Sequence, residues 1–448
     1  MTVPRTDELS ASLSGGVLAQ PSFQPFNPAF PVRPAALVSP TDIHDVVTAV
    51  SWAAKNDMPV QVMATGHGLH GPVDGGVLIT TEQLGGVTID PDRRTATIGA
   101  GVRWAQVIEA AAPYGLAPVN GSSSGVGAVG YTLGGGSGPL SRAYGFSADH
   151  VLRARLVDGK GIVHEVDDDR DRELFWALRG GKGNFGVVTE LEIELMPVAT
   201  LYGGAIFFPG AAAHDVLHAF ATWSAALPEE VSTTSIALLR LPPLPELPEP
   251  LRGQFVVSLR YAHLGGAEAA AELLAPMRAV ATPLIDAVQE IPYAAVDSIH
   301  QDPTDPIPFW DGGTGLRDLS AAAVDALLEV AGPGQDIPVP VVEVRLLGGA
   351  MARPAAIPNA VSGRDTAYAL TTVGILTPDT AEIVPGLVDG IVAAVAPWRS
   401  RFDLFNLIGR ATPQRVAGLW DDQDRDRLLA VKHRLDPAGL FGGGHAIT

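Results

Sequence analysis

Residues 121–145, GSSSGVGAVGYTLGGGSGPLSRAYG, contain nine glycines in 25 positions. Apolar and aromatic residues such as Val129, Leu133 and Tyr144 are interspersed among them, so the segment can pack its side chains instead of acting as a flexible linker. Glycine permits positive φ and lets backbone N–H groups come close to an anion. The stretch therefore predicts a backbone cradle for a phosphate-bearing ligand.

Residues 125–130 of this stretch match the pattern G-x-G-x-x-G. A dinucleotide-binding turn of that kind needs a buried strand before it and an unbroken helix after it. Three serines, residues 122–124, precede the pattern, and glycines at 134–136 and 138 would interrupt a helix after it. We therefore disfavour a Rossmann turn, and a loop that merely turns tightly is the remaining alternative.

Size and composition limit the classes of protein that are possible. A chain of 448 residues exceeds the range in which one core keeps growing, so two domains are expected. The net charge of −19 argues against nucleic acid or an anionic membrane as a partner. There is no cysteine, which excludes disulfides and cysteinyl chemistry. The start of the chain does not resemble a signal peptide, and we expect a cytoplasmic monomer or homodimer without a metal site.

The pattern of predicted helices and strands changes along the chain. Short strand and helix patterns alternate from residue 33 to about 197, and longer amphipathic helices and strands follow. We predict an α+β fold with a first domain at 1–198, a second at 199–400, and a segment at 401–448 that returns to the first. We expect the second domain to be a sheet with helices on one face, which leaves the other face free to cover a binding site.

Three glycine-rich loops lie in the first domain, at residues 64–68 (ATGHG), 121–138 and 179–186 (RGGKGNFG). In this order they resemble the PCMH-type FAD-binding domain of the vanillyl-alcohol oxidase and para-cresol methylhydroxylase superfamily. The resemblance extends from residue 33 to 441 and is greatest to the branch with berberine bridge enzymes and hydroxynicotine oxidases. It implies an N-terminal FAD-binding domain and a substrate domain with an antiparallel sheet backed by helices.

The resemblance also implies how the flavin is attached. The family motif at the first loop is typically Arg-x-Gly-Gly-His, whose histidine is usually bonded to the flavin 8α carbon. Residues 63–67 here read Met-Ala-Thr-Gly-His, so the histidine is kept while the arginine and one glycine are not. His67 is therefore the implied attachment point, with His70 as a competitor. Many relatives add a cysteinyl bond, but Ser123 stands at that position, which implies a single histidyl link.

Backbone groups of the first two loops would surround the pyrophosphate in this resemblance. Asn184 and Val187 would touch the adenosine side, and Asn406 would lie near the flavin ring. The complete set of implied cofactor-binding residues is Ala64, Thr65, Gly66, His67, Gly68, Ser122, Ser123, Gly125, Gly127, Gly130, Tyr131, Gly134, Gly135, Asn184, Val187 and Asn406.

Catalytic candidates come mainly from the predicted strand at 341–346. The two-residue period of a strand puts Glu343 and Arg345 on one face and the valines on the other. If the valines pack on helices, the charged face looks toward the flavin. Glu343 is then either a base with a raised pKa or one half of an ion pair with Arg345, and a structural pair at a solvated edge is the alternative. Tyr131 and Tyr368 are further candidates as bases or as wall residues.

The implied function is that of an FAD-dependent oxidoreductase. The resemblance indicates an oxidase that moves a hydride from an alcohol or amine carbon of a small organic molecule to FAD, which O2 reoxidises to give H2O2. The alternatives are a dehydrogenase with another acceptor, a flavin-bearing protein that sequesters or reoxidises a drug for self-resistance, and a fold without flavin. No motif identifies the substrate.

Overall fold

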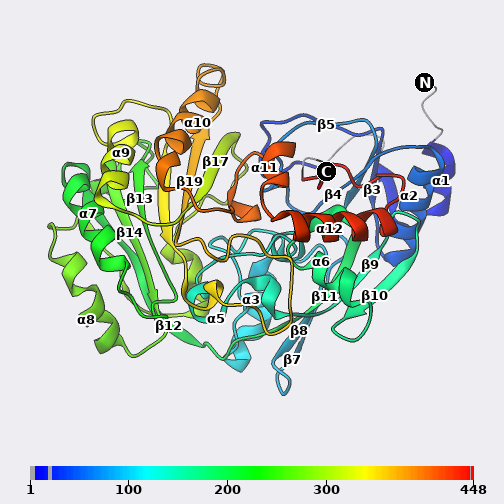
Figure 1. Cartoon of the computed structure of the whole chain (residues 1–448), viewed down its shortest axis with the longest axis horizontal. Coiled ribbons are helices and arrows are strands. Elements are labelled where there is room, and N and C mark those ends of the chain that lie inside the picture. Colours follow the sequence, from blue (N-terminus) through cyan, green and yellow to red (C-terminus); the bar gives the residue numbers. More distant parts are fainter. Residues whose placement is uncertain (1–5, 19–22, 444) are drawn as a thin grey trace.

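The computed structural model describes residues 6–18, 23–443 and 445–448, and its strands fall into two groups (Figure 1). Three sheets come from the first part of the chain and one large sheet from the second. The first group comprises the sheet β1 (Gly16–Leu18), β3 (Ala36–Ser39), β6 (Val77–Thr80), β4 (Val60–Met63); the sheet β10 (Val163–Asp167), β9 (Val151–Val157), β11 (Val187–Glu194), β8 (Thr95–Gly99), β7 (Val87–Asp90); and the pair β2 (Val32–Arg33), β5 (Val73–Asp74).

Parallel and antiparallel pairing separate the two main sheets of this first part. β3, β6 and β4 run parallel, whereas every neighbour pair in the β10–β7 sheet is antiparallel. The accompanying helices are α1 (Thr6–Ser12), α2 (Ile43–Lys55), α3 (Trp104–Ala111), α4 (Ala128–Thr132), α5 (Ser141–Tyr144) and α6 (Arg172–Leu178). One continuous apolar core holds these elements together.

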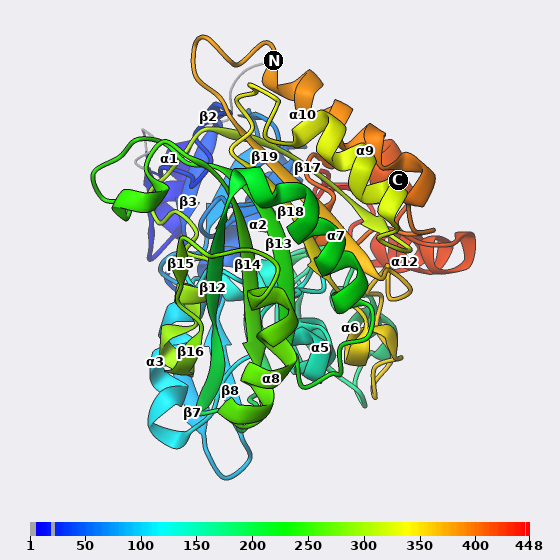
Figure 2. The same ribbon diagram turned by 90° about the vertical axis from the view of Figure 1, so that its left-hand side faces the viewer.

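The second part forms one antiparallel sheet in the order β15–β12–β14–β13–β18–β19–β17, with β16 beside β12. Its helices lie together on one face, as Figure 2 shows. The elements are β12 (Thr200–Pro209), α7 (Ala213–Ser224), β13 (Thr233–Arg240), β14 (Phe255–His263), α8 (Ala267–Arg278), β15 (Ile285–Asp286), β16 (Gln289–Pro292), η6 (Tyr293–Ile299), β17 (Phe309–Leu316), α9 (Ala321–Ala331), β18 (Val341–Leu346), β19 (Tyr368–Ile375) and α10 (Val384–Ala394).

The alternation of β18 explains why only one face carries helices. Val342, Val344 and Leu346 are buried in the core that the sheet shares with α7, α8, α9 and α10. Glu343 and Arg345 point to the opposite face, where the sheet faces the first part of the chain. The prediction of an α+β protein with a helix-backed antiparallel sheet is confirmed.

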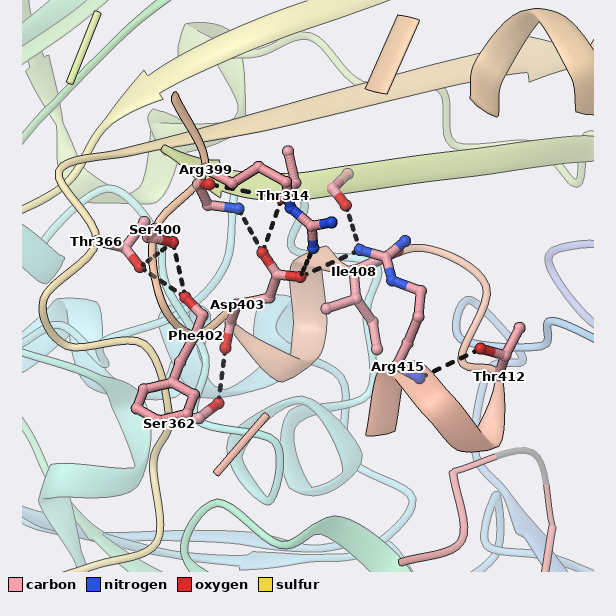
Figure 3. Close-up of polar contacts among 12 residues, drawn as sticks. Thr314, Ser362, Thr366, Arg399, Ser400, Phe402, Asp403, Ile408, Thr412 and Arg415 are labelled. Carbon is pink, nitrogen blue, oxygen red and sulfur yellow. Dashed lines mark hydrogen bonds and ion pairs between the residues drawn. The ribbon is translucent and has the colours of Figure 1, made fainter. Parts of the chain in front are cut away.

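Asp403 ties the C-terminal segment to the large sheet (Figure 3). Its carboxylate accepts from Thr314 Oγ1 at 2.9 Å, from the Gly315 N–H at 2.7 Å and from Arg399 Nη2 at 2.9 Å. Arg415 Nη2 adds a contact of 3.3 Å. The segment then continues through η9 (Phe405–Leu407), α11 (Pro413–Ala417) and α12 (Asp422–Leu435).

α12 returns to the first part of the chain. Two ion pairs join it to α6 and its N-cap, Arg427 to Glu173 and Arg434 to Asp171, each at 2.8 Å. In Figure 1 α12 lies across this half of the molecule, beside α6. Among the described residues, no helix is both long enough and apolar enough to span a lipid bilayer.

Candidate functional site

The first glycine-rich loop follows β4 and presents His67. Gly66 has φ of +75°, and a Cβ there would lie 2.5 Å from Pro25 Cβ, so the turn requires glycine. The His67 ring stacks on Phe26 with the ring centroids 3.8 Å apart, and its Nδ1 lies 2.8 Å from Thr65 Oγ1. The loop therefore holds the imidazole in one orientation.

His67 is a neutral imidazole. Burial, assisted by the positive charge of Arg103, lowers the pKa of His67 to about 4. Its competitor differs, because His70 Nδ1 lies 3.1 Å from the Asp311 carboxylate of β17. Among the described residues, no carboxylate comes within ion-pair distance of His67. A neutral ring nitrogen is nucleophilic, so His67 suits covalent attachment better than His70.

The second loop meets the third loop and the C-terminal segment near Gly134. A Cβ on Gly134 would lie 2.1 Å from Asn406 Oδ1 and 2.6 Å from Lys182 Cε, so only glycine lets these side chains approach. Asn406 Nδ2 donates to the Tyr131 carbonyl at 2.8 Å. The helix that begins within the G-x-G-x-x-G pattern, α4, has only five residues, which agrees with the rejection of a Rossmann turn.

Several features of these loops fit FAD. The buried hydroxyl of Tyr131 and the buried Oδ1 of Asn406 have no hydrogen-bond partner among the described residues. Gly68 and Gly130 are exposed, and a Cβ on either would meet no atom within 4 Å, so the chain itself does not require glycine there. Close approach of a ligand to the backbone accounts for both observations.

We call the surface formed by the glycine-rich loops and Asn406 the wall. Lys182 adds a positive charge to it. It lies in the third loop, and burial lowers the pKa of its amine to about 8, with no charged group offsetting the burial. In the described part of the chain no carboxylate pairs with it. An anion such as a phosphate or a reduced flavin would stabilise the protonated amine.

A hollow of about 270 Å³ lies beside the first loop, and Arg103 supplies positive charge to it. Its lining is Ala64, Thr65, Glu82, Gly85, Gly101, Arg103 and Gln106. A larger hollow of about 400 Å³ lies between α3 and η6, but its charged residues are Glu109 and Asp297, which do not suit a phosphate. Of the two hollows, only the smaller has a basic side chain, Arg103, to offset its carboxylate, Glu82, so it suits an anionic part of the cofactor better.

Two of the implied adenosine residues have other partners. Asn184 Nδ2 donates to the carbonyls of Gly181 and His445 at 2.8 and 3.0 Å, and its Oδ1 accepts from the Ile447 N–H at 3.0 Å. Val187 is buried within β11. The Asn184 side chain thus fastens the C-terminal end of the chain, and contact of Asn184 and Val187 with the adenosine stays a prediction.

A cluster of charges lies on the helix-free face of the large sheet, and we call Arg260, Glu343, Arg345 and His300 the roof cluster. Arg260 Nη1 donates to Glu343 at 2.7 Å, and Arg345 Nη2 does so at 3.1 Å. The pairing of β14, β13 and β18 explains this, because Ser235 lies opposite both Arg260 and Arg345. The predicted pair of Glu343 and Arg345 is therefore buried and includes a second arginine.

Glu343 is ionised in this setting. Burial alone would raise its pKa, but Arg345 and Arg260 outweigh that effect and hold the pKa well below the usual range. Of the two roles predicted for Glu343, the structure thus supports the ion pair over the base with a raised pKa. Arg345 Nη1 also donates to the Ser137 carbonyl at 3.3 Å, which brings the roof cluster against the glycine-rich segment.

The tautomer of His300 follows from its neighbour. Arg345 Nη2 lies 3.2 Å from His300 Nε2, and because a guanidinium only donates, Nε2 must accept. The proton is therefore on Nδ1, which is buried without a partner. Burial, with Arg345 and Arg260 nearby, holds the pKa of His300 well below its usual value. His300 is thus a neutral ring whose Nε2 lies 3.8 Å from Glu343 Oε1 and whose Nδ1–H is a donor without a partner among the described residues.

The two tyrosine candidates lie in different places. Tyr131 is in the second loop, where burial raises the pKa of its hydroxyl, so it is a poor base. Tyr368 lies opposite Leu346 on the helix-covered face, and its hydroxyl is 3.0 Å from Ser224 Oγ of α7. The structure does not bring Tyr368 to the roof cluster, and this corrects its prediction as a catalytic residue.

The expectation of no metal site left out one motif of the sequence. His214 and His218 have the spacing H-x-x-x-H, which the sequence prediction overlooked. The structure places Asp325 of α9 beside them, with one potential ligand atom of each residue within 4.8 Å of the others. This group lies on the two helices, on the face of the sheet opposite the roof cluster.

Several residues at the site were not predicted. Lys182 was visible only as a charged residue inside a glycine-rich loop, and His300 and Asp297 lie in or next to η6, where no periodic pattern marks them. Asp297 accepts from the Ser124 N–H at 3.0 Å and so joins η6 to the second loop. The role of these residues follows from their neighbours in space, which the sequence pattern does not reveal.

Known proteins share this organisation. Residues 34–167 match the FAD binding domain family. (R)-6-hydroxynicotine oxidase from Paenarthrobacter nicotinovorans is 28% identical over 91% of this chain and 90% of its own length. Matches to other curated relatives, among them FAD-linked oxidoreductases and FAD-dependent monooxygenases, cover 47% or less of those proteins.

Solved structures agree over the whole chain. 6-Hydroxy-D-nicotine oxidase from Arthrobacter nicotinovorans superposes with a TM-score of 0.85 at 24% identity, covering 98% of both chains. Glucooligosaccharide oxidase from Acremonium strictum gives a TM-score of 0.85 at 19% identity, also over 98% of both chains. Residues 34–167 therefore carry an FAD binding domain, and the whole chain shares the two-domain fold of these two oxidases.

Proposed function

We propose that the protein is an oxidase that takes a hydride from an alcohol or amine carbon of a small organic molecule and passes the electrons to O2, giving H2O2. One observation carries the proposal: Arg345 of the roof cluster contacts the Ser137 carbonyl in the glycine-rich segment. Charged groups of the large sheet thus stand directly over the loops that fit FAD. Substrate would bind between these two surfaces.

FAD would be bonded through His67 alone. The neutral ring, fixed by Phe26 and Thr65, supports this assignment. The glucooligosaccharide oxidase structure is described as carrying a 6-S-cysteinyl, 8α-N1-histidyl FAD. This chain has no cysteine, so only the histidyl bond is available to it. Ser123 then lies near the flavin without bonding to it.

FAD supplies the hydride-accepting chemistry when bound. The roof cluster supplies orientation: ionised Glu343 accepts a hydrogen bond from a substrate hydroxyl or amine, and the neutral His300 donates one. Arg260 and Arg345 hold Glu343 in place from both sides. Because Glu343 and His300 are both buried, these contacts form away from bulk water and gain strength there.

The first test is the colour of the purified protein. A yellow protein that keeps its flavin in the pellet after acid precipitation supports covalent FAD, whereas a colourless protein contradicts any flavin function. Sugars, alkaloid amines and phenolic or polyketide alcohols are then screened for flavin bleaching under anaerobic conditions and for peroxide in air. Bleaching with peroxide release is expected for one class; bleaching that only an artificial acceptor reverses would instead indicate a dehydrogenase.

A further inference from the structure

Two histidines of α7 stand one helical turn apart on the surface of the second domain. His214 and His218 are four residues apart, so they lie on the same side of the helix, and their ring centroids are 4.4 Å apart. α7 packs against α9, and the two helices run beside each other in Figure 2. Asp325 of α9 faces the pair, with its Oδ1 2.9 Å from His218 Nε2.

The neighbouring carboxylate of Asp215 helps to define the ligand atoms. His214 Nδ1 lies 3.0 Å from Asp215 Oδ1, and a proton shared there leaves the lone pair of His214 on Nε2. One potential ligand atom from each of His214, His218 and Asp325 lies within 4.8 Å of the others. A bound Zn²⁺ has ligands about 2.0–2.2 Å away, so small rotations of these exposed side chains would bring them to one ion.

We propose that His214, His218 and Asp325 form a binding site for a divalent cation of the Zn²⁺ class, which bridges α7 and α9. Two imidazoles and one carboxylate suit Zn²⁺, Ni²⁺ or Cu²⁺ and not Mg²⁺ or Ca²⁺, which prefer oxygen ligands alone. The net charge of −19 favours cation binding in general. Among the described residues, His218–Asp325 is the one ion pair that joins α7 to α9. A bound ion would add a second connection between the two helices.

The site is separate from the proposed oxidase chemistry. Val216, Leu217 and Phe220 on the inner side of α7 are buried in the core between the helices and the sheet, and the roof cluster lies on the other face of that sheet. The metal therefore acts on the stability of the helix layer. Its binding does not depend on which substrate the flavin site accepts.

The test is a titration of the FAD-loaded full-length protein, without a histidine tag, with ZnCl2. Calorimetry should give one ion per chain, and the thermal midpoint should rise as Zn²⁺ is added, because an ion that binds only the folded state stabilises it. MgCl2 should do neither. Acidification should weaken binding, because protons compete with the ion for its ligand atoms.

Three variants and a control decide which residues bind. His214→Ala, His218→Ala and Asp325→Asn should each weaken Zn²⁺ binding by at least about tenfold, since each removes a ligand. His433→Ala, at an exposed histidine of α12, should leave the affinity unchanged. Circular dichroism checks that each variant is folded. Absence of saturable binding, or an affinity that His218→Ala leaves unchanged, would overturn the site and show that His218 and Asp325 form only an ion pair.

Discussion

The wall built from the glycine-rich loops and the roof cluster both hold buried polar atoms without partners among the described residues, but they differ in how their charges are paired. In the wall, the Tyr131 hydroxyl and Asn406 Oδ1 are buried without partners, and no carboxylate among the described residues pairs with Lys182. In the roof cluster the one carboxylate, Glu343, accepts from two arginines. Each roof arginine therefore has a carboxylate partner, although the cluster keeps a net charge of +1, whereas Lys182 of the wall has no carboxylate partner among the described residues.

This difference assigns different roles to the two regions. An unpaired buried cation and unpartnered buried dipoles cost free energy, so the wall gains from a ligand that supplies an anion and hydrogen bonds. The roof cluster needs no ligand to hold its geometry. It can therefore orient a substrate before the reaction begins, which is the arrangement that electrostatic catalysis requires.

The largest expected effect is on the wall. His67→Ala removes the only predicted attachment point, so all flavin should move to the supernatant on acid precipitation. His70→Ala is the control, because His70 pairs with Asp311, and it should keep its flavin in the pellet. Covalent flavin in His67→Ala, or its loss in His70→Ala, would contradict the assignment.

Glu343→Gln tests how much the ion pairs of the roof cluster stabilise the protein. It leaves two buried guanidinium groups without their carboxylate, which should lower the free energy of unfolding by about 3–5 kcal/mol. Urea unfolding measures this, with Glu229→Gln as a control at an exposed pair with Arg353. Since the folded pKa of Glu343 is lowered, its contribution is present above the unfolded value of 4.5 and is lost as the pH falls further. A loss no greater than in the control would show that the cluster is not stabilising.

Lys182→Met tests the unpaired charge of the wall. Burial lowers the pKa of Lys182 from 10.5 to about 8, so between these values the unfolded chain binds more protons, and stability should rise with pH. The measurement is the urea midpoint of flavin-free His67→Ala protein across that range. The rise should disappear when Lys182→Met is added, and it should shrink when free FAD is supplied. An unchanged pH dependence in the double variant would mean that Lys182 is not the titrating group.

Tyr368→Phe should have the smallest effect. The hydroxyl bonds to Ser224 on the helix-covered face, so its loss should cost about 0.5–1.5 kcal/mol of unfolding free energy. Because Tyr368 is remote from the roof cluster, the rate of flavin reduction by an identified substrate should stay within about twofold of wild type. A large loss of that rate with normal stability would restore Tyr368 as a catalytic candidate.

The outline of the fold was predictable from local patterns. The two-residue alternation of the strand at 341–346 correctly placed its valines on helices and Glu343 with Arg345 on the other face. The third loop was also recognised, but the role of its Asn184 was not, because the carbonyl of His445 and the N–H of Ile447 satisfy it from more than 250 residues away. Lys182 lies in the same loop but has no carboxylate partner among the described residues. Its proposed role in binding an anion rests on that unpaired charge.

The sequence by itself predicted a backbone cradle for a phosphate-bearing ligand, because backbone freedom is a local property, and its resemblance to a known family indicated that the ligand is FAD. It also excluded a cysteinyl bond, since the chain has no cysteine. Only the tertiary structure decided that Arg260 shares Glu343, that His300 is neutral with its proton on Nδ1, and that Asp325 joins His214 and His218. Charge state and ligand geometry depend on burial and on neighbours from distant strands and helices, and no local pattern encodes them.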